Sequence, residues 1–146
     1  MADRYALEQV GAADGTQNPP KKLDGRLVGA KDRIIRASLP GVQLAVGDRL
    51  YLGKRPAGSI LHSVSGLVGA SLGTTTISIG TTASPAKYVN AKTLTAVDTP
   101  TALGPTAVSA FAAPNDADED IWMTVGVAAI PNTVVGGIRL HYSTST

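Results

Sequence analysis

Residues 47–100, GDRLYLGKRPAGSILHSVSGLVGASLGTTTISIGTTASPAKYVNAKTLTAVDTP, consist of short apolar and β-branched runs separated by turn residues. Leu50 and Leu52 alternate with other residues, and Ile77 and Ile79 do the same. Alternation with a period of two is typical of a strand with one buried face. The stretch therefore predicts a sheet of short strands, and it contains almost nothing chemically reactive.

The same pattern continues outside this stretch. Apolar residues alternate from Ile121 to Val127 and from Ile138 to Tyr142. Further candidate strands are 33–39, 59–68, 87–96 and 106–112, with Gly, Pro, Asn and Asp turns between them. About eight short strands at this spacing predict an all-β fold, a single β-sandwich. Eight strands in two sheets is the number found in a jelly roll, although periodicity does not give the strand order.

The 146 residues are enough for one domain. Hydrophobic residues make up 43% of the chain but aromatic residues only 4%, so we expect a core of Val, Ile, Leu and Ala. Residues 1–25 show no sustained period and have the composition of an extended N-terminal arm, followed by a sandwich domain of residues 26–146. The arm either adds as a strand to a neighbour's sheet or is a frayed terminus.

The chain contains no cysteine, which excludes a disulfide framework, a thiolate nucleophile and a Cys-type zinc site. We expect no cofactor and no metal. No apolar run approaches the roughly 18 residues of a membrane-spanning helix, and the first ten residues lack a secretory signal. These features predict a soluble protein made in the cytoplasm.

One motif resembles a catalytic signature. Residues 69–73, GASLG, match the G-x-S-x-G nucleophile elbow, and His141 follows downstream. That elbow needs a helix after Ser71, whereas the residues that follow are typical of a strand. We therefore expect a hairpin turn and no enzyme activity. His62 and His141 have no carboxylate within a few residues, which favours ordinary histidines over metal ligands.

Charge is distributed unevenly although the net charge is only +2. Residues 1–55 contain ten Lys and Arg against six Asp and Glu, while residues 56–146 contain three against five. The basic groups include Lys21-Lys22, Arg33, Arg36 and Lys54-Arg55. They could contact nucleic-acid phosphates, but few aromatic residues are available for base stacking. A solvated or protein-docking basic face is favoured.

Two features near residue 120 remain open to two interpretations each. Asp116, Asp118, Glu119 and Asp120 form the one acidic cluster, which is either a solvated loop or a docking patch for a basic partner. Trp122 alternates with Ile121 and Met123, so it either points outward as an interface residue or packs across the second layer of the sandwich.

Four segments carry a family resemblance: GDRLYLGKRPAGSIL (47–61), LGTTTISIGT (72–81), SPAKYVNAKTLTAVDTPT (84–101) and DEDIWMTVGVAAIP (118–131). Together with the apolar closing strand, they resemble capsid cement, or decoration, proteins of tailed bacteriophages over about two-thirds of the chain. The resemblance implies a β-sandwich, often a jelly roll, that assembles as small homo-oligomers on the outside of an icosahedral head. It also implies binding to an HK97-like major capsid protein.

The leading hypothesis is a virion protein that stabilises the head by bridging major capsid protein subunits. A receptor-binding or tail-fibre module is the alternative, although it would need aromatic residues gathered on loops. The candidate capsid contacts come from the basic arm, the basic strand and the acidic cluster with its tryptophan: Arg4, Tyr5, Lys21, Lys22, Arg26, Arg33, Arg36, Asp118, Glu119, Asp120 and Trp122.

Overall fold

The computed structural model describes residues 15–20, 22, 31–106 and 114–144. These residues form eight strands and no helix: β1 (Asp32–Ser38), β2 (Arg49–Arg55), β3 (Ile60–Val68), β4 (Thr76–Gly80), β5 (Val89–Thr93), β6 (Thr101–Gly104), β7 (Glu119–Gly126) and β8 (Gly136–Ser143). The predicted all-β fold is therefore confirmed. In this part of the chain there is accordingly no helix long and apolar enough to cross a membrane.

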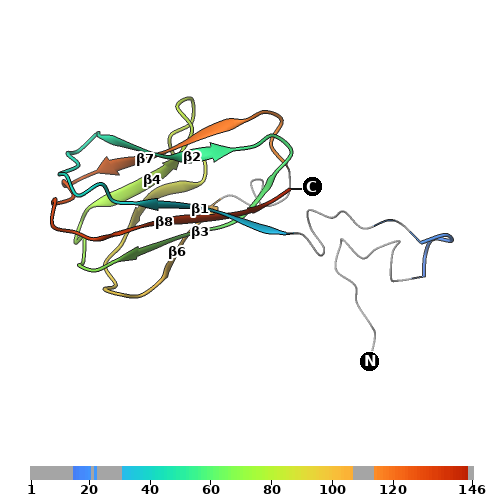
Figure 1. The fold of residues 1–146 in the computed structure, drawn as a ribbon, viewed down its shortest axis with the longest axis horizontal. Helices are drawn as coiled ribbons and strands as arrows, with labels where there is room; N and C mark the ends of the chain where they lie inside the picture. Colours follow the sequence, from blue (N-terminus) through green and yellow to red (C-terminus); the bar gives the residue numbers. More distant parts are fainter. Residues whose placement is uncertain (1–14, 21, 23–30, 107–113, 145–146) are drawn as a thin grey trace.

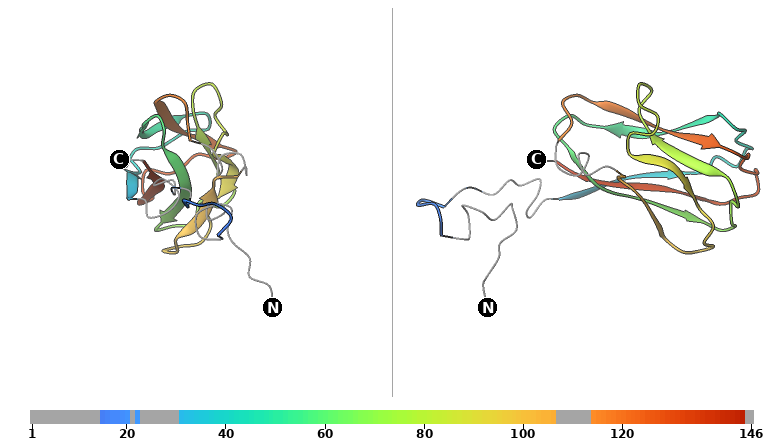
Figure 2. Two further views of the ribbon diagram at one scale, coloured as in Figure 1. Left: turned by 90° about the vertical axis from the view of Figure 1, so that its right-hand side faces the viewer. Right: turned by 180° about the vertical axis from the view of Figure 1, so that it is seen from behind.

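The strands form two four-stranded antiparallel sheets that face each other (Figure 1). The first sheet has the order β1-β8-β3-β6, and the second has the order β2-β7-β4-β5. Figure 2 shows the two layers from the end and from behind. This arrangement is the β-sandwich that the alternating sequence predicts.

Four connections between the sheets meet at one end of the sandwich, which we call the loop end: residues 39–48, 69–75, 94–100 and 127–135. Backbone hydrogen bonds join these loops to one another. Leu44 and Ile130 exchange two such bonds, of 3.0 and 2.8 Å, and Leu72 N donates to Leu94 O at 2.9 Å. The loop end is therefore tied together by main-chain bonds.

Residues 15–20 and 22 contain no regular structure and lie apart from the sheets in both figures. The first strand begins at Asp32. The division into an arm of residues 1–25 and a domain of residues 26–146 remains a prediction, because most of the proposed arm lies outside the described residues.

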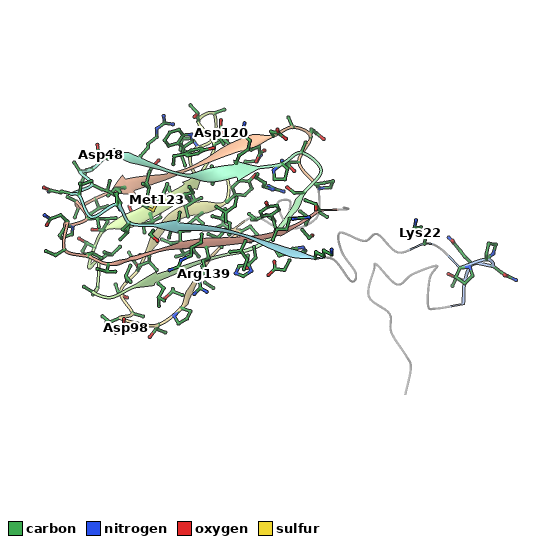
Figure 3. The ribbon with its side chains drawn as sticks, viewed as in Figure 1. Lys22, Asp48, Asp98, Asp120, Met123 and Arg139 are labelled. Carbon is green, nitrogen blue, oxygen red and sulfur yellow. The ribbon has the colours of Figure 1, made fainter. Side chains whose placement is uncertain are left out.

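Strand β7 shows how the apolar alternation builds the core. Ile121, Met123 and Val125 are buried between the sheets, while Trp122 and Thr124 lie on the outer face of the second sheet. Figure 3 shows Met123 in the space between the sheets. Val, Ile and Leu dominate the core as expected, but no alanine among the described residues is buried, so the expected contribution of Ala is wrong. Tyr88 is the one fully buried aromatic residue among those described.

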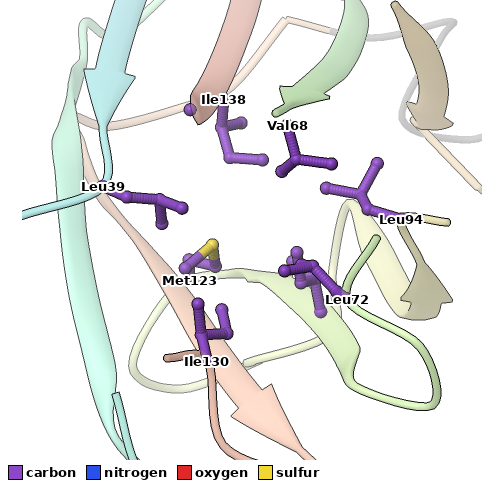
Figure 4. A pocket seen from close by; sticks show the side chains of 9 residues that line it. Leu39, Val68, Leu72, Leu94, Met123, Ile130 and Ile138 are labelled. Carbon is purple, nitrogen blue, oxygen red and sulfur yellow. The ribbon is translucent and has the colours of Figure 1, made fainter. Parts of the chain in front are cut away.

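A small apolar space lies in the core near the loop end (Figure 4). Its volume is about 10 Å³, and its lining includes Leu72, Met123 and Ile138, so both sheets contribute to it. A space of this size holds at most one water, which would find no polar partner there. It is a packing gap and not a ligand site.

Gly53 allows the two sheets to approach each other closely at one edge. A bulge between Tyr51 and Gly53 interrupts the pairing of β2 with β7, and Gly53 has a φ of 153°. A Cβ atom at this position would lie 2.9 Å from the Cγ2 atom of Ile35 on the opposite sheet. Glycine is therefore required both by the backbone conformation and by the contact.

The strand expected at 106–112 falls almost entirely outside the described residues and stays a prediction: only residue 106 is described, and it lies outside any strand. The sixth strand, Thr101–Gly104, was not predicted from the sequence. It follows the turn at Pro100 and pairs with β3 at the edge of the first sheet. The strand predicted at 87–96 is shorter, at Val89–Thr93.

Candidate docking surfaces

The predicted contacts in the arm cannot be placed. Arg4, Tyr5, Lys21 and Arg26 lie outside the described residues, and Lys22 is exposed in a segment without regular structure. Their role in binding stays a prediction.

The two basic residues of β1 lie on opposite faces of that strand. Arg33 lies opposite Tyr142 of β8, and its Nε atom donates a hydrogen bond of 3.2 Å to Thr144 Oγ1. Arg36 lies opposite Arg139, on the outer face of the first sheet. The sequence cluster 33–36 is therefore divided by the alternation of the strand, and the structure does not bring its two arginines together.

A groove of about 550 Å³ runs over the outer face of the first sheet toward the loop end. We call it the basic groove, because Arg36 and Arg139 both line it. Its apolar lining is formed by Ile34, Leu67, Val134 and Val135. Ile34 is 55% exposed and Val135 is 78% exposed, so the groove offers apolar surface beside two cations.

The three candidate residues of the acidic cluster, Asp118, Glu119 and Asp120, lie at the start of β7, and each has a different partner. Asp118 Oδ1 accepts a hydrogen bond of 2.8 Å from the backbone N of Ala57. Asp120 Oδ1 accepts one of 2.9 Å from the hydroxyl of Tyr51, and Figure 3 shows Asp120 on the outside of the second sheet. This hydrogen bond to Asp120 raises the pKa of Tyr51. Both carboxylates therefore have internal partners, whether or not they also meet another protein.

Glu119 lies on the face of β7 opposite to Asp120. It joins a hydrogen-bond network at the end of the sandwich that is opposite the loop end. Its carboxylate accepts hydrogen bonds from the ammonium group of Lys87, at 2.5 Å, and from the hydroxyl of Tyr88. Arg55, which is only 3% exposed, lies 3.8 Å from the same carboxylate. The side chain of Glu119 is 15% exposed, so its charge mainly serves the fold.

The pKa shifts of Glu119, Lys87 and Tyr88 all favour the same protonation state of this network. Burial by itself would raise the pKa of Glu119, but the hydrogen bonds from Lys87 and Tyr88 outweigh it and lower that pKa. The hydrogen bond to Glu119 raises the pKa of Lys87. Burial, followed by the hydrogen bond to Glu119, raises the pKa of Tyr88. An ionised carboxylate beside a protonated amine and a neutral phenol is the favoured state.

Trp122 lies on the outer face of the second sheet, so it points outward and does not pack across the second layer, while its role as an interface residue stays a prediction. The guanidinium group of Arg49 lies 4.3 Å from the centre of its ring, and the ring of Tyr51 lies 5.0 Å away at 57°. Arg49 also donates to Thr82 Oγ1 at 3.1 Å. We call Arg49, Tyr51 and Trp122 the aromatic patch. The tryptophan is half-buried by its neighbours.

The loop end carries exposed apolar residues that sequence reasoning did not select. Among the described residues, five of the large hydrophobic side chains that are exposed belong to its loops: Val42, Val46, Val97, Val127 and Val135. Val127 has a φ of 68°, which is rare for a β-branched residue. Valines inside turn-rich segments such as PGVQLAVGD (40–48) and IPNTVVGG (130–137) were the available signal.

The residues with possible catalytic chemistry do not form a site. Ser71 is exposed in the connection that leads into β4, and its Oγ atom accepts a hydrogen bond of 3.2 Å from Gly73 N. The predicted hairpin turn is wrong, because β3 and β4 lie in different sheets and this segment crosses between them. His141 contacts Asp32 at 2.8 Å and His62 contacts Ser143 at 2.7 Å. The first pair joins positions 109 residues apart, which the sequence could not show. No group of three metal-ligating side chains occurs within the described ranges.

Comparison with known proteins connects the fold to two phages. No protein-family model and no curated protein matches the chain. A chain in the capsid asymmetric unit of cyanophage Pam1 is 15% identical, over 79% of this chain and 84% of its own length, with a TM-score of 0.54. A chain in the capsid of Ralstonia phage GP4 is 18% identical, over 80% and 85%, with a TM-score of 0.55. At these identities the similarity shows that the chain shares their fold.

Proposed function

We propose that this chain is a structural protein of a phage virion that binds the outer surface of the head and bridges subunits of the major capsid protein. The observation that carries the proposal is the shared fold: the matched chains come from two phage capsids, and about four-fifths of each chain aligns. The absence of a catalytic or metal-binding constellation among the described residues is compatible with such a role.

We also propose that the sandwich is a jelly roll. The orders β1-β8-β3-β6 and β2-β7-β4-β5 support this assignment, because the chain passes between the sheets at every connection except β4–β5. The first and last strands are neighbours in one sheet, and β2 and β7 are neighbours in the other. Pairing of the first strand with the last, and of the second with the second-to-last, is the strand order of the two Greek keys in a jelly-roll domain.

The surfaces suited to bridging are spread over the molecule. The basic groove lies on the outer face of the first sheet, and the aromatic patch lies on the outer face of the second sheet. The arm precedes the edge strand β1 and can extend to a neighbouring subunit by strand addition. A protein with contact surfaces on two faces can touch two capsid subunits at once.

Bridging would stabilise the head through simple linkage. A ligand that binds the mature shell but not its separated subunits shifts the equilibrium toward the shell. Many copies, each with a modest interface, act together through multivalency. We expect the partner to be an HK97-like major capsid protein and the bound form to be a small homo-oligomer, made in the host cytoplasm and carried on the virion surface.

The test uses heads of the virus that encodes this chain, prepared without the protein. Purified protein should sediment with expanded heads, saturate at a fixed number of copies per head, and raise the temperature at which the heads release DNA. Unexpanded proheads serve as the matched control and should bind less. Failure to bind expanded heads, or equal heat stability with and without the protein, would overturn the proposal.

The receptor-binding alternative has one observation in its favour. Tyr51 and Trp122 lie side by side on an outer face, and Tyr51 is 46% exposed. Exposed aromatic pairs suit stacking on ligands. Arg49, however, already covers part of the tryptophan ring. A positive glycan-array result that is lost in Trp122→Ala would favour this alternative over head binding.

A further inference from the structure

We propose that the basic groove binds an extended acidic segment of another protein, with one carboxylate held between Arg36 and Arg139. The inference goes beyond the proposed function, because it names the chemistry of a partner segment and its place on this chain. It does not require that the partner be a capsid protein.

The two arginines are brought together by strand register. Arg36 of β1 lies directly opposite Arg139 of β8, and both side chains are exposed on the outer face. Directly opposed residues of an antiparallel pair have Cβ atoms about 5 Å apart, and like charges at this position destabilise the sheet. The sequence places the two residues 103 positions apart, from 36 to 139, so only the fold reveals the pair.

No acidic side chain neutralises this pair within the described part of the chain. Neither Arg36 nor Arg139 takes part in a salt bridge there, and the groove lining includes no Asp or Glu. Asp32 shares the outer face of β1, but its carboxylate contacts His141 at 2.8 Å. Two guanidinium groups without a counter-ion favour an anion from outside the chain.

The apolar half of the groove selects the kind of anion. Ile34, Leu67, Val134 and Val135 lie around the arginines, and the volume of about 550 Å³ is that of a small-ligand site. A peptide segment can place a carboxylate on the guanidinium groups and its apolar neighbours on the exposed side chains of Ile34 and Val135. A nucleic acid would instead need more cations and an aromatic surface for its bases, and the lining has no aromatic residue.

The probe is a capped pentapeptide, TVEVT, titrated into the full chain labelled with ¹⁵N and followed by NMR. We expect saturable shifts at the Nε–H groups of Arg36 and Arg139 and at the amides of Ile34 and Val135. The uncharged analogue TVQVT should bind at least tenfold more weakly. Equal binding of the two peptides, or shifts confined to another surface, would overturn the proposal.

Three variants make the test specific. Arg36→Gln and Arg139→Gln should each weaken TVEVT binding at least fivefold, because two charge-assisted bonds to the carboxylate become one. Lys54→Gln removes one exposed positive charge from the second sheet and should leave binding unchanged. Arg139→Gln should also raise the melting temperature of the free protein, because it removes the like-charge pair. Unchanged peptide binding in both arginine variants would contradict the assignment.

Two further ligands separate the possible anions. Inorganic phosphate should shift the same arginine signals but not those of Val135, and a ten-nucleotide oligothymidylate should bind more weakly than TVEVT. Tighter binding of the oligonucleotide would overturn the choice of a protein segment. Since these titrations use no heads, normal head binding without peptide binding refutes the groove alone. Peptide binding without head binding refutes the proposed function alone.

Discussion

Arg55 donates a hydrogen bond of 2.7 Å from its Nη1 atom to the hydroxyl oxygen of Tyr88, and the hydroxyl group of Tyr88 in turn donates to Glu119. Ser59 completes the shell of Arg55 by accepting bonds of 2.9 Å at Oγ and 2.7 Å at its carbonyl oxygen. Each of the three nitrogen atoms of this cation, which is 3% exposed, thus donates a hydrogen bond. The network fixes the start of β7.

Replacing Glu119 by Gln should destabilise the protein by about 2–4 kcal/mol, because Arg55 would lose its nearby counter-charge while remaining buried. Chemical denaturation at pH 7 measures the free energy of unfolding. Asp116→Asn is the matched control, since it removes a carboxylate from the same cluster at an exposed position, and it should change stability by less than about 0.5 kcal/mol. Equal effects of the two substitutions would show that Glu119 is only a surface charge.

The same network predicts how stability depends on pH. Because the pKa of Glu119 is lower in the folded state than its usual value of 4.5, its contribution is present above about that pH and is lost as the pH falls through the folded pKa. The pKa values of Lys87 and Tyr88 are raised, so their contributions are lost on the alkaline side, above roughly pH 10. Urea midpoints measured from pH 7 down to pH 3 should fall less steeply in Glu119→Gln than in the native chain.

Val127→Gly should stabilise the protein by about 1 kcal/mol. Valine at a φ of 68° is strained, and its side chain is exposed, so little burial is lost with it. The greater freedom of glycine in the unfolded chain offsets part of the gain. Calorimetry should show a rise in melting temperature of about 3 °C. Val42→Gly, an exposed valine at another site of the loop end, should give no such rise.

Gly53→Ala should cost about 2 kcal/mol, because the added methyl group would meet Ile35 across the sandwich and the backbone would be strained. Combining it with Ile35→Ala should recover part of this cost, as a double-mutant cycle with a coupling of about 1 kcal/mol. Gly69→Ala provides the control, since its new Cβ would lie 3.4 Å from the nearest backbone atom. Strict additivity at 53 and 35 would mean that the two sheets do not meet there.

Trp122 is the single tryptophan of the chain, so it reports on the aromatic patch. If that patch contacts the head, protein labelled with 5-hydroxytryptophan should become less accessible to acrylamide when it binds expanded heads. The label is excited at a wavelength where the tryptophans of the heads do not absorb. Binding with unchanged quenching would place the contact on another surface, and the basic groove would be the next one to examine.

The alternation of apolar residues was sufficient to predict the class of fold and most strands. It left the direction of Trp122 open between the outer face and the second layer, and the structure places Trp122 on the outer face, opposite Ile121 and Met123. It missed Thr101–Gly104, which is a short edge strand that pairs through few residues. Short edge strands bury little surface and therefore leave a weak pattern in the sequence.

The site residues were harder to predict because their surroundings come from distant parts of the chain. Glu119 looked like one of several loop carboxylates, yet its partners Lys87 and Tyr88 lie 32 and 31 residues away. Arg139 was not among the predicted contacts, because no other Lys or Arg lies near it in the sequence. The register of β1 against β8 is what places it beside Arg36.

A density map of the intact virus particle tests the central proposal most directly. From this proposal we expect an eight-stranded sandwich on the outer surface of the head, placed where major capsid protein subunits meet, with density continuous into its N-terminal residues. A sandwich found only in the tail or its fibres, or a particle that contains no density for this chain, would contradict it.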